Sequence, residues 1–246
     1  MAEQAYMKNP HLNGDDILLH GNKTGIILIH GFTATTAEVR LLAERLHLAG
    51  YSVAAPLLPG HNTHPEDLNR ATWQMWYEKV NQTYKAFITR CDRIFVGGES
   101  MGALLAIELA AQHPEIAGLF LFAPATKIQR LWLSRILATF KPYLPKSMKE
   151  DGQPWKGYTV YPLKGSVELL KLQKHARRQL KHITLPTLVF TGAYDKTIHT
   201  DSADIVLKGI DSQQKQHIEL ENSGHVILLD QDLDKVEDKI LELINA

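Results

Sequence analysis

The sequence predicts an α/β fold in which a mostly parallel β-sheet is covered by helices on both faces. Two observations carry this prediction. Short apolar runs alternate with helical patterns along most of the chain, and several of the runs are apolar at nearly every position, as in strands buried on both faces. The chain of 246 residues, 44% of them hydrophobic, is long enough to bury a large core.

The expected elements follow from local patterns taken in chain order. Strands are expected where apolar runs lie between turn residues, at residues 17–19, 25–30, 51–55, 94–96, 118–122, 187–191 and 216–220. Helices are expected where apolar residues recur at helical spacing, at residues 36–48, 72–90, 103–111, 202–207 and 230–244. Thr36 and Thr72 are the expected N-caps of the first two helices. This alternation predicts that reactive groups lie at the carboxyl ends of the strands.

The alternation is interrupted once, by a long insertion. It stops at residues 123–125 and resumes at residue 187, which is too long a gap for an ordinary loop. We therefore expect a core of residues 1–125 and 183–246 and a cap inserted at residues 126–182. The insertion ends in a helical pattern over residues 166–180 and opens with an apolar stripe at helical spacing: Ile128, Leu131, Trp132, Ile136 and Phe140.

The charges are unevenly distributed along the chain. The formal net charge is zero, which predicts no nucleic-acid partner. Residues 127–182, however, hold 13 lysines and arginines against three acidic residues, a net charge of +10 that leaves −10 for the remainder. This basic cap is either a solvated face or a surface that attracts acidic esters and makes transient contact with anionic lipids.

The cysteine content and the composition of the N-terminal residues indicate the cellular compartment in which the protein is expected. The single cysteine, Cys91, excludes an internal disulfide and agrees with a reducing compartment. Residues 1–16 are polar and lack the apolar core of a signal peptide, and no run of the chain is long enough to span a bilayer. A cytoplasmic location is therefore expected.

A glycine-serine motif lies at the junction of a strand and a helix. The apolar residues 94–96 lead into Gly98, Ser100 and Gly102, which form the pattern Gly-x-Ser-x-Gly, and helix formers follow. A serine at such a sharp turn projects its hydroxyl out of the sheet, and the small glycines allow the close approach that the turn needs. Without this context the pattern would indicate only a Gly-Ser loop.

Two later loops supply partners for this serine. Asp195 follows the strand at residues 187–191, and His225 lies in the loop before the terminal helix, so the order is Ser100, Asp195, His225. We expect His225 to take the Ser100 proton while Asp195 orients the imidazole and stabilises its charged form. The backbone N–H groups of Phe32 and Met101 are the expected oxyanion donors.

Asp195 and several other acidic and histidine residues have alternative interpretations. Asp195 has an alternative interpretation as an ordinary turn residue. His30 is expected to organise the oxyanion turn rather than to transfer protons. His61, His64 and Asp67 match no zinc signature, so no metal site is expected and the loop is expected to line the pocket.

Several motifs together resemble the α/β-hydrolase superfamily, and within it the bacterial carboxylesterase and monoacylglycerol lipase group. They occupy residues 30–33 (His-Gly-Phe-Thr), 59–61 (Pro-Gly-His), 98–102 (Gly-Glu-Ser-Met-Gly) and 222–225 (Asn-Ser-Gly-His). The resemblance implies a triad of Ser100, Asp195 and His225, oxyanion donors at Phe32 and Met101, no cofactor, and a small cap. Glu99 departs from the group, which often has an apolar residue there; it either raises the pKa of His225 or pairs elsewhere.

The leading functional hypothesis is a serine carboxylesterase that hydrolyses short to medium-chain acyl esters through an acyl-enzyme intermediate. The alternative is a monoacylglycerol lipase that releases fatty acid and glycerol. A non-catalytic binding protein and an enzyme of the same fold with another reaction, such as carbon–carbon bond hydrolysis or perhydrolysis, are the other two classes considered. The expected partner is a small-molecule ester, and the protein is expected to be a monomer or a homodimer.

Overall fold

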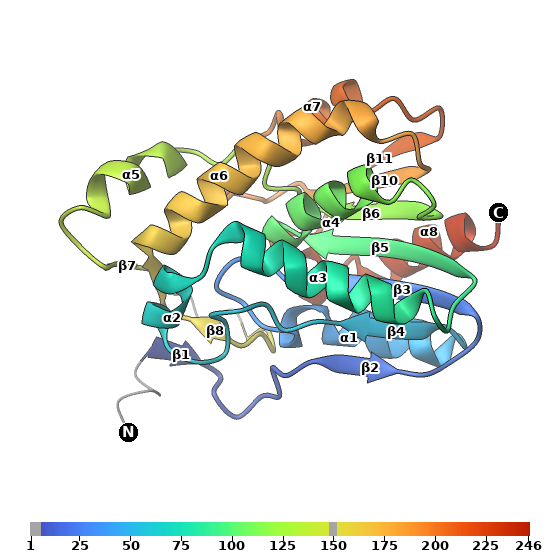
Figure 1. Ribbon diagram of the computed structural model, residues 1–246, viewed down its shortest axis with the longest axis horizontal. Helices are drawn as coiled ribbons and strands as arrows, with labels where there is room; N and C mark the ends of the chain where they lie inside the picture. The colour runs from blue at the N-terminus through green and yellow to red at the C-terminus, as the bar shows by residue number, and fades with distance from the viewer. Residues whose placement is uncertain (1–5, 148–151) are drawn as a thin grey trace.

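A seven-stranded sheet forms the centre of the molecule, as seen in the computed structural model, which describes residues 6–147 and 152–246. The strand order is β11-β10-β6-β5-β3-β4-β2, and every pair is parallel except β2 with β4 (Figure 1). The predicted fold class is confirmed. The strands of this sheet are β2 (Ile17–Leu19), β3 (Thr24–Ile29), β4 (Ser52–Ala55), β5 (Arg93–Glu99), β6 (Gly118–Phe122), β10 (Thr187–Gly192) and β11 (Lys215–Leu220).

Helices cover both faces of this sheet. One face carries α1 and α8, which contact each other, and α3 and α4 pack together on the other, where α6 lies against α4 (Figure 1). Helix α4 is buried along nearly its whole length, because it lies between the sheet and its neighbouring helices. The helices are α1 (Ala37–Leu48), α2 (Pro65–Arg70), α3 (Trp73–Phe87), α4 (Met101–Gln112), α5 (Ser134–Leu137), α6 (Leu163–Gln179), α7 (Ser202–Gly209) and α8 (Leu233–Ile244).

Helix ends differ from the sequence expectations where side chains have other partners. The Thr72 hydroxyl accepts from the N–H of Met75 and caps α3 as expected. The Thr36 hydroxyl instead donates to the carbonyl of Asp15, so it makes no cap for α1. Helix α2 was not expected; it begins at Pro65 after His64, whose ring nitrogen accepts from the N–H of Glu66.

The segment between β6 and β10 leaves the sheet and forms small elements of its own. Strand β7 (Tyr143–Pro145) pairs with β9 (Val160–Pro162), and β8 (Gly157–Tyr158) pairs with β1 (Met7–Lys8) from the start of the chain. Of the charged residues in this basic segment, Lys149, Glu150 and Asp151 lie outside the described residues.

The apolar stripe expected at the start of this segment is divided between the core and the surface. The helical structure there is limited to a 3₁₀ turn (Leu131–Leu133) and the four residues of α5. The side chains of Trp132, Ile136 and Phe140 are 58%, 52% and 79% exposed, whereas Ile128 and Leu131 pack against the core. So short a helix cannot turn every member of the stripe toward the core.

None of the helices in the described part of the chain combines the length and the apolar character needed to cross a membrane.

Candidate active site

Ser100 occupies a strained turn between β5 and α4. Its backbone has φ 55° and ψ −106°, a conformation that residues with a side chain rarely adopt. The Ser100 N–H donates to the carbonyl of Phe122, 2.8 Å away, which ties the turn to β6. A Cβ atom at Gly102 would lie 2.1 Å from the Ile29 carbonyl oxygen, and one at Gly98 would lie 2.2 Å from the Gly102 carbonyl, so only glycine fits at either position.

The structure brings Ser100, His225 and Asp195 into one hydrogen-bonded chain. The Ser100 Oγ lies 3.0 Å from Nε2 of His225, and Nδ1 of His225 lies 2.7 Å from Oδ2 of Asp195. With its Nδ1 proton directed to the carboxylate, the imidazole presents Nε2 as an acceptor for the serine proton. The arrangement can activate the hydroxyl as a nucleophile.

Asp195 is held as a carboxylate by its hydrogen bonds. Burial by itself would raise the pKa of Asp195, but the bond from His225 and the charge of that imidazole outweigh it and hold the pKa below its usual value. The N–H groups of Thr197 and Ile198 also donate to Oδ1, at 2.7 and 3.2 Å. The carboxylate is therefore ionised at neutral pH and able to stabilise an imidazolium.

The loops that carry Asp195 and His225 contact each other directly. A Cβ atom at Gly192 would lie 2.1 Å from the Gly224 carbonyl oxygen. The Asp232 carboxylate accepts from the Ser223 hydroxyl at 2.7 Å, and Asp230 accepts from the Gly224 N–H at 2.8 Å. These contacts set the position of His225 from the start of α8.

The turn after β3 places Phe32 in the same cavity wall as Ser100. His30 is fully buried, which lowers the pKa of its imidazole to about 4, and the neutral ring accepts from the N–H of Leu58 through Nε2. Its Nδ1 is then the donor to the Gly31 carbonyl, 2.9 Å away, so His30 organises this turn as expected. Met101 is the first residue of α4, where an N–H has no acceptor within the helix.

Two buried carboxyl groups, those of Glu38 and Glu99, bind the backbone of this site. The sequence motifs single out Glu99 but not Glu38. Glu38 accepts from the Gly31 N–H at 2.5 Å, and Oε1 of Glu99 accepts from the Ile227 N–H at 2.5 Å, whereas Oε2 of Glu99 has no hydrogen-bond partner among the residues that the structure describes. Burial raises the pKa of Glu38 to about 7 and, together with the neighbouring Glu38, raises the pKa of Glu99 well above its usual range. Glu99 thus bonds to the backbone two residues beyond His225.

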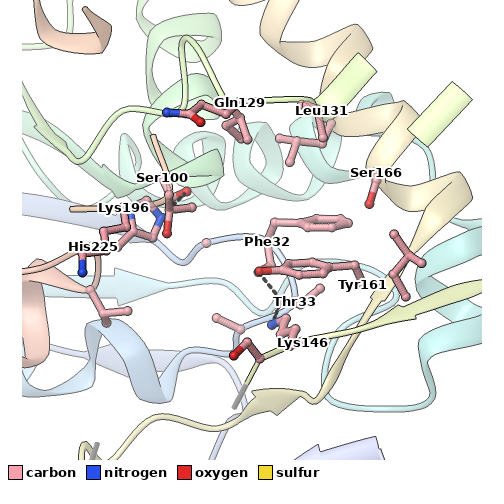
Figure 2. A pocket seen from close by; sticks show the side chains of 18 of the residues that line it. Phe32, Thr33, Ser100, Gln129, Leu131, Lys146, Tyr161, Ser166, Lys196 and His225 are labelled. Atoms are coloured by element: carbon pink, nitrogen blue, oxygen red, sulfur yellow. Dashed lines mark hydrogen bonds between the residues drawn. The ribbon is translucent and has the colours of Figure 1, made fainter. Parts of the chain in front are cut away.

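A cavity of about 920 Å³ opens beside Ser100 and His225. Its wall is mostly apolar and aromatic, and it also carries the charged side chains of Glu38, Arg130, Lys146, Lys196 and Asp230. Figure 2 shows Lys146 and Lys196 on this wall. The apolar and aromatic lining residues include Phe32, Ile128, Leu131, Leu133, Leu137, Leu144, Trp155, Tyr161, Leu163 and Leu169.

The expectation that the loop of His61, His64 and Asp67 lines this cavity is wrong, because none of these three residues is among those that line it. His61 is instead buried against the rings of His30, Phe32 and Trp76 and packs beneath the turn after β3. Among residues 6–147 and 152–246, no group of three or more histidine, cysteine, aspartate or glutamate side chains is arranged to hold a metal ion.

Sequence comparisons connect this geometry to known proteins. The family described as "Serine aminopeptidase, S33" matches residues 21–154 and 159–232. A thermostable monoacylglycerol lipase of Bacillus sp. (strain H-257) is 34% identical over 241 residues, which cover 95% of each chain. A carboxylesterase of Bacillus subtilis (strain 168) is 28% identical over 91% of this chain and 93% of its own.

Structural comparisons show that solved structures of lipolytic enzymes share this fold. A structure of a metagenome-derived lipolytic enzyme, from work on the pair LipS and LipT, superimposes with a TM-score of 0.90 at 28% identity and covers 94% of this chain and 97% of its own. The monoacylglycerol lipase of Paleococcus ferrophilus superimposes with a TM-score of 0.78 over 95% of this chain and 99% of its own, at 18% identity.

Proposed function

The chain belongs to the serine aminopeptidase S33 family, and from this premise we propose that it is a serine carboxylesterase acting on short to medium-chain acyl esters. One observation carries the proposal: the hydrogen-bonded chain from Ser100 through His225 to Asp195 ends in a largely apolar cavity. The relatives that match over nearly their whole length are a monoacylglycerol lipase and a carboxylesterase, which favours ester rather than peptide substrates.

In the proposed mechanism, Ser100 Oγ attacks the ester carbonyl while His225 Nε2 takes its proton. Asp195 stabilises the imidazolium that forms, and the N–H groups of Phe32 and Met101 bind the oxyanion of the tetrahedral intermediate. His225 then gives the proton to the departing alcohol, which leaves an acyl group on Ser100. Water activated by His225 repeats the attack and releases the carboxylic acid.

The test is intact mass after incubation with a fluorophosphonate, on the wild type and the Ser100→Ala variant in parallel. A single adduct on the wild type and none on the variant is expected, followed by hydrolysis of 4-nitrophenyl butyrate by the wild type alone. A folded wild type that forms no adduct, or a variant that keeps full esterase activity, would overturn the proposal.

Monoacylglycerol lipase activity is the second candidate, favoured by the 34% identity to the Bacillus enzyme. It predicts that kcat/KM for a 1-monoacylglycerol exceeds that for an ethyl ester of the same acyl chain. Equal values for the two substrates would exclude it and leave the carboxylesterase.

We also propose that residues 126–182 act as a cap, with the core formed by residues 1–125 and 183–246. The exposed side chains of Trp132, Ile136 and Phe140 lie beside Arg135 in the sequence, a combination that suits transient contact with an anionic lipid surface. Sedimentation with anionic vesicles, but not with zwitterionic vesicles, is expected. The proposed location is the cytoplasm. The proposed oligomeric state is a monomer or a homodimer, and light scattering would distinguish the two.

A further inference from the structure

A lysine side chain is built into the wall of the cavity that holds Ser100. Lys146 follows β7, and its ammonium group donates to the hydroxyl of Thr33, the residue after the proposed oxyanion donor Phe32. In Figure 2 Lys146, Thr33 and Tyr161 lie on one side of the cavity and Ser100 and His225 on the other. The mechanism described above uses Lys146 in no step.

The Lys146 ammonium has no carboxylate partner within ion-pair distance among residues 6–147 and 152–246. Its partners there are the Thr33 hydroxyl and two aromatic rings, those of Tyr161 and Trp155, whose centroids lie 5.0 and 5.5 Å from Nζ. One of its three N–H bonds therefore has a protein oxygen as acceptor, and the other two have none in the described part of the chain.

The surroundings of Lys146 disfavour its charged form. The side chain as a whole is half-buried, but its ammonium end is desolvated, which lowers the pKa of Lys146 to about 7. Glu38 is the acidic group that opposes this shift, and it is itself buried, already accepts the Gly31 N–H and has a raised pKa. An anion beside Nζ would remove the cost, because the charged form of a buried amine is stabilised by a nearby opposite charge.

We propose that Lys146 and Thr33 form an anion subsite, so that the cavity takes esters carrying a carboxylate at some distance from the scissile bond. The inference rests on the proposed esterase function and specifies its substrate class. The shared chemistry is a carboxylate on either the acyl part or the alcohol part of the ester, and the two are separated by experiment. Lys146 would act on specificity and not on the chemical step.

The test compares matched pairs of esters that differ only in this charge. On the acyl side, the 4-nitrophenyl monoesters of adipic and suberic acid are each compared with the corresponding ω-carboxamide. On the alcohol side, 4-acetoxybenzoate is compared with 4-acetoxybenzamide. The readout is the ratio of kcat/KM for the acid to that for the amide, which cancels general damage to the enzyme.

Three variants assign the effect to Lys146. Lys146→Met removes the charge, and Lys146→Gln removes it while keeping an N–H donor for Thr33. Lys141→Met removes one charge from an exposed position of the same segment that does not line the cavity. In at least one substrate pair, the acid-to-amide ratio is expected to fall by about tenfold or more in both Lys146 variants, and to stay at the wild-type value in Lys141→Met.

Each of the remaining outcomes would overturn either the anion subsite or the proposed esterase function. A wild type that prefers the amide in every pair, or an equal fall in Lys141→Met, excludes the subsite even if a Lys146 variant fails to fold. A preference that disappears in 0.5 M salt indicates long-range attraction by the basic surface and also excludes it. Failure to hydrolyse any of the acids or amides would instead overturn the proposed esterase function.

Discussion

At the scale of single residues, the electrostatics of the site depend on a few buried groups. Asp195 keeps its charge because three donors face it, whereas burial outweighs the backbone donors of Glu38 and Glu99 and raises the pKa of both carboxyl groups. A carboxyl group can thus be ionised at one position and neutral at another, because hydrogen bonds and burial set its pKa. Two predictions follow from this contrast.

Asp195→Asn should lower kcat for ester hydrolysis by roughly 10³–10⁴-fold with little change in the melting temperature. An amide in place of the carboxylate favours the wrong imidazole tautomer and does not stabilise the imidazolium. Steady-state kinetics and a thermal melt check this result. Asp204→Asn, an exposed aspartate of α7, is the control and should match the wild type; a fall of less than tenfold in Asp195→Asn would contradict the proposed role.

Glu99→Gln should become more stable relative to the wild type as pH rises. Because the pKa of Glu99 is raised in the folded protein, the folded state binds more protons than the unfolded state above about pH 4.5, and wild-type stability is lost as pH rises further. Glutamine keeps an acceptor for Ile227 and removes this loss. The difference in free energy of unfolding should grow in favour of the variant by about 1 kcal/mol or more between pH 5 and pH 8.

Urea unfolding at several pH values measures that difference. Glu44→Gln, at an exposed position of α1, is the matched control and should show a difference that does not change with pH. A Glu99→Gln curve parallel to the wild type would mean that Glu99 titrates normally.

At the scale of elements, the junction of β5 and α4 depends on close backbone contact. Gly102→Ala should lower the free energy of unfolding by about 3 kcal/mol or more, because its Cβ would meet the backbone of Ile29, which cannot move away. A Cβ at Gly97 would meet side-chain atoms of Leu28, Phe122 and Phe120 at 3.1, 3.2 and 3.4 Å, so Gly97→Ala should cost about 1 kcal/mol. Urea unfolding measures the loss of unfolding free energy in the two variants. Equal losses would show that the Ile29 contact is not the reason that position 102 requires glycine.

At the scale of the whole molecule, the start of the chain is joined to the proposed cap. Strand β1 pairs with β8, the Thr159 N–H donates to the Tyr6 carbonyl at 2.8 Å, and the Asn9 amide donates to the Trp155 carbonyl at 2.7 Å. Deletion of residues 1–9 should speed hydrogen exchange at residues 157–159 by about tenfold or more. Strand β5 is the internal control and should be unchanged, whereas equal acceleration in β5 would indicate global destabilisation.

Local sequence patterns determined the central sheet of this protein and the residues of its candidate site. The alternation of buried strands and helices predicted the sheet, and the motifs around Ser100, Asp195 and His225 predicted the residues that the structure brings within hydrogen-bond distance. Such features are readable because a buried strand needs apolar residues throughout and a sharp strand-to-helix turn needs glycine on both sides of the serine. The exposed face of Trp132, Ile136 and Phe140 was not predicted, since helical spacing does not tell which side of a short helix finds a partner.

Only the tertiary structure decided which side chains share an environment. Glu38 and Glu99 are 61 positions apart in the sequence, yet Glu38 raises the pKa of Glu99; Lys146 and Thr33 are 113 apart, yet they are hydrogen-bonded in the wall of the cavity. The pairing of β1 with β8 likewise joins segments far apart in the chain. The pKa of a carboxyl or an ammonium depends on its burial and on the charges around it, and folding sets both by contacts between distant parts of the chain.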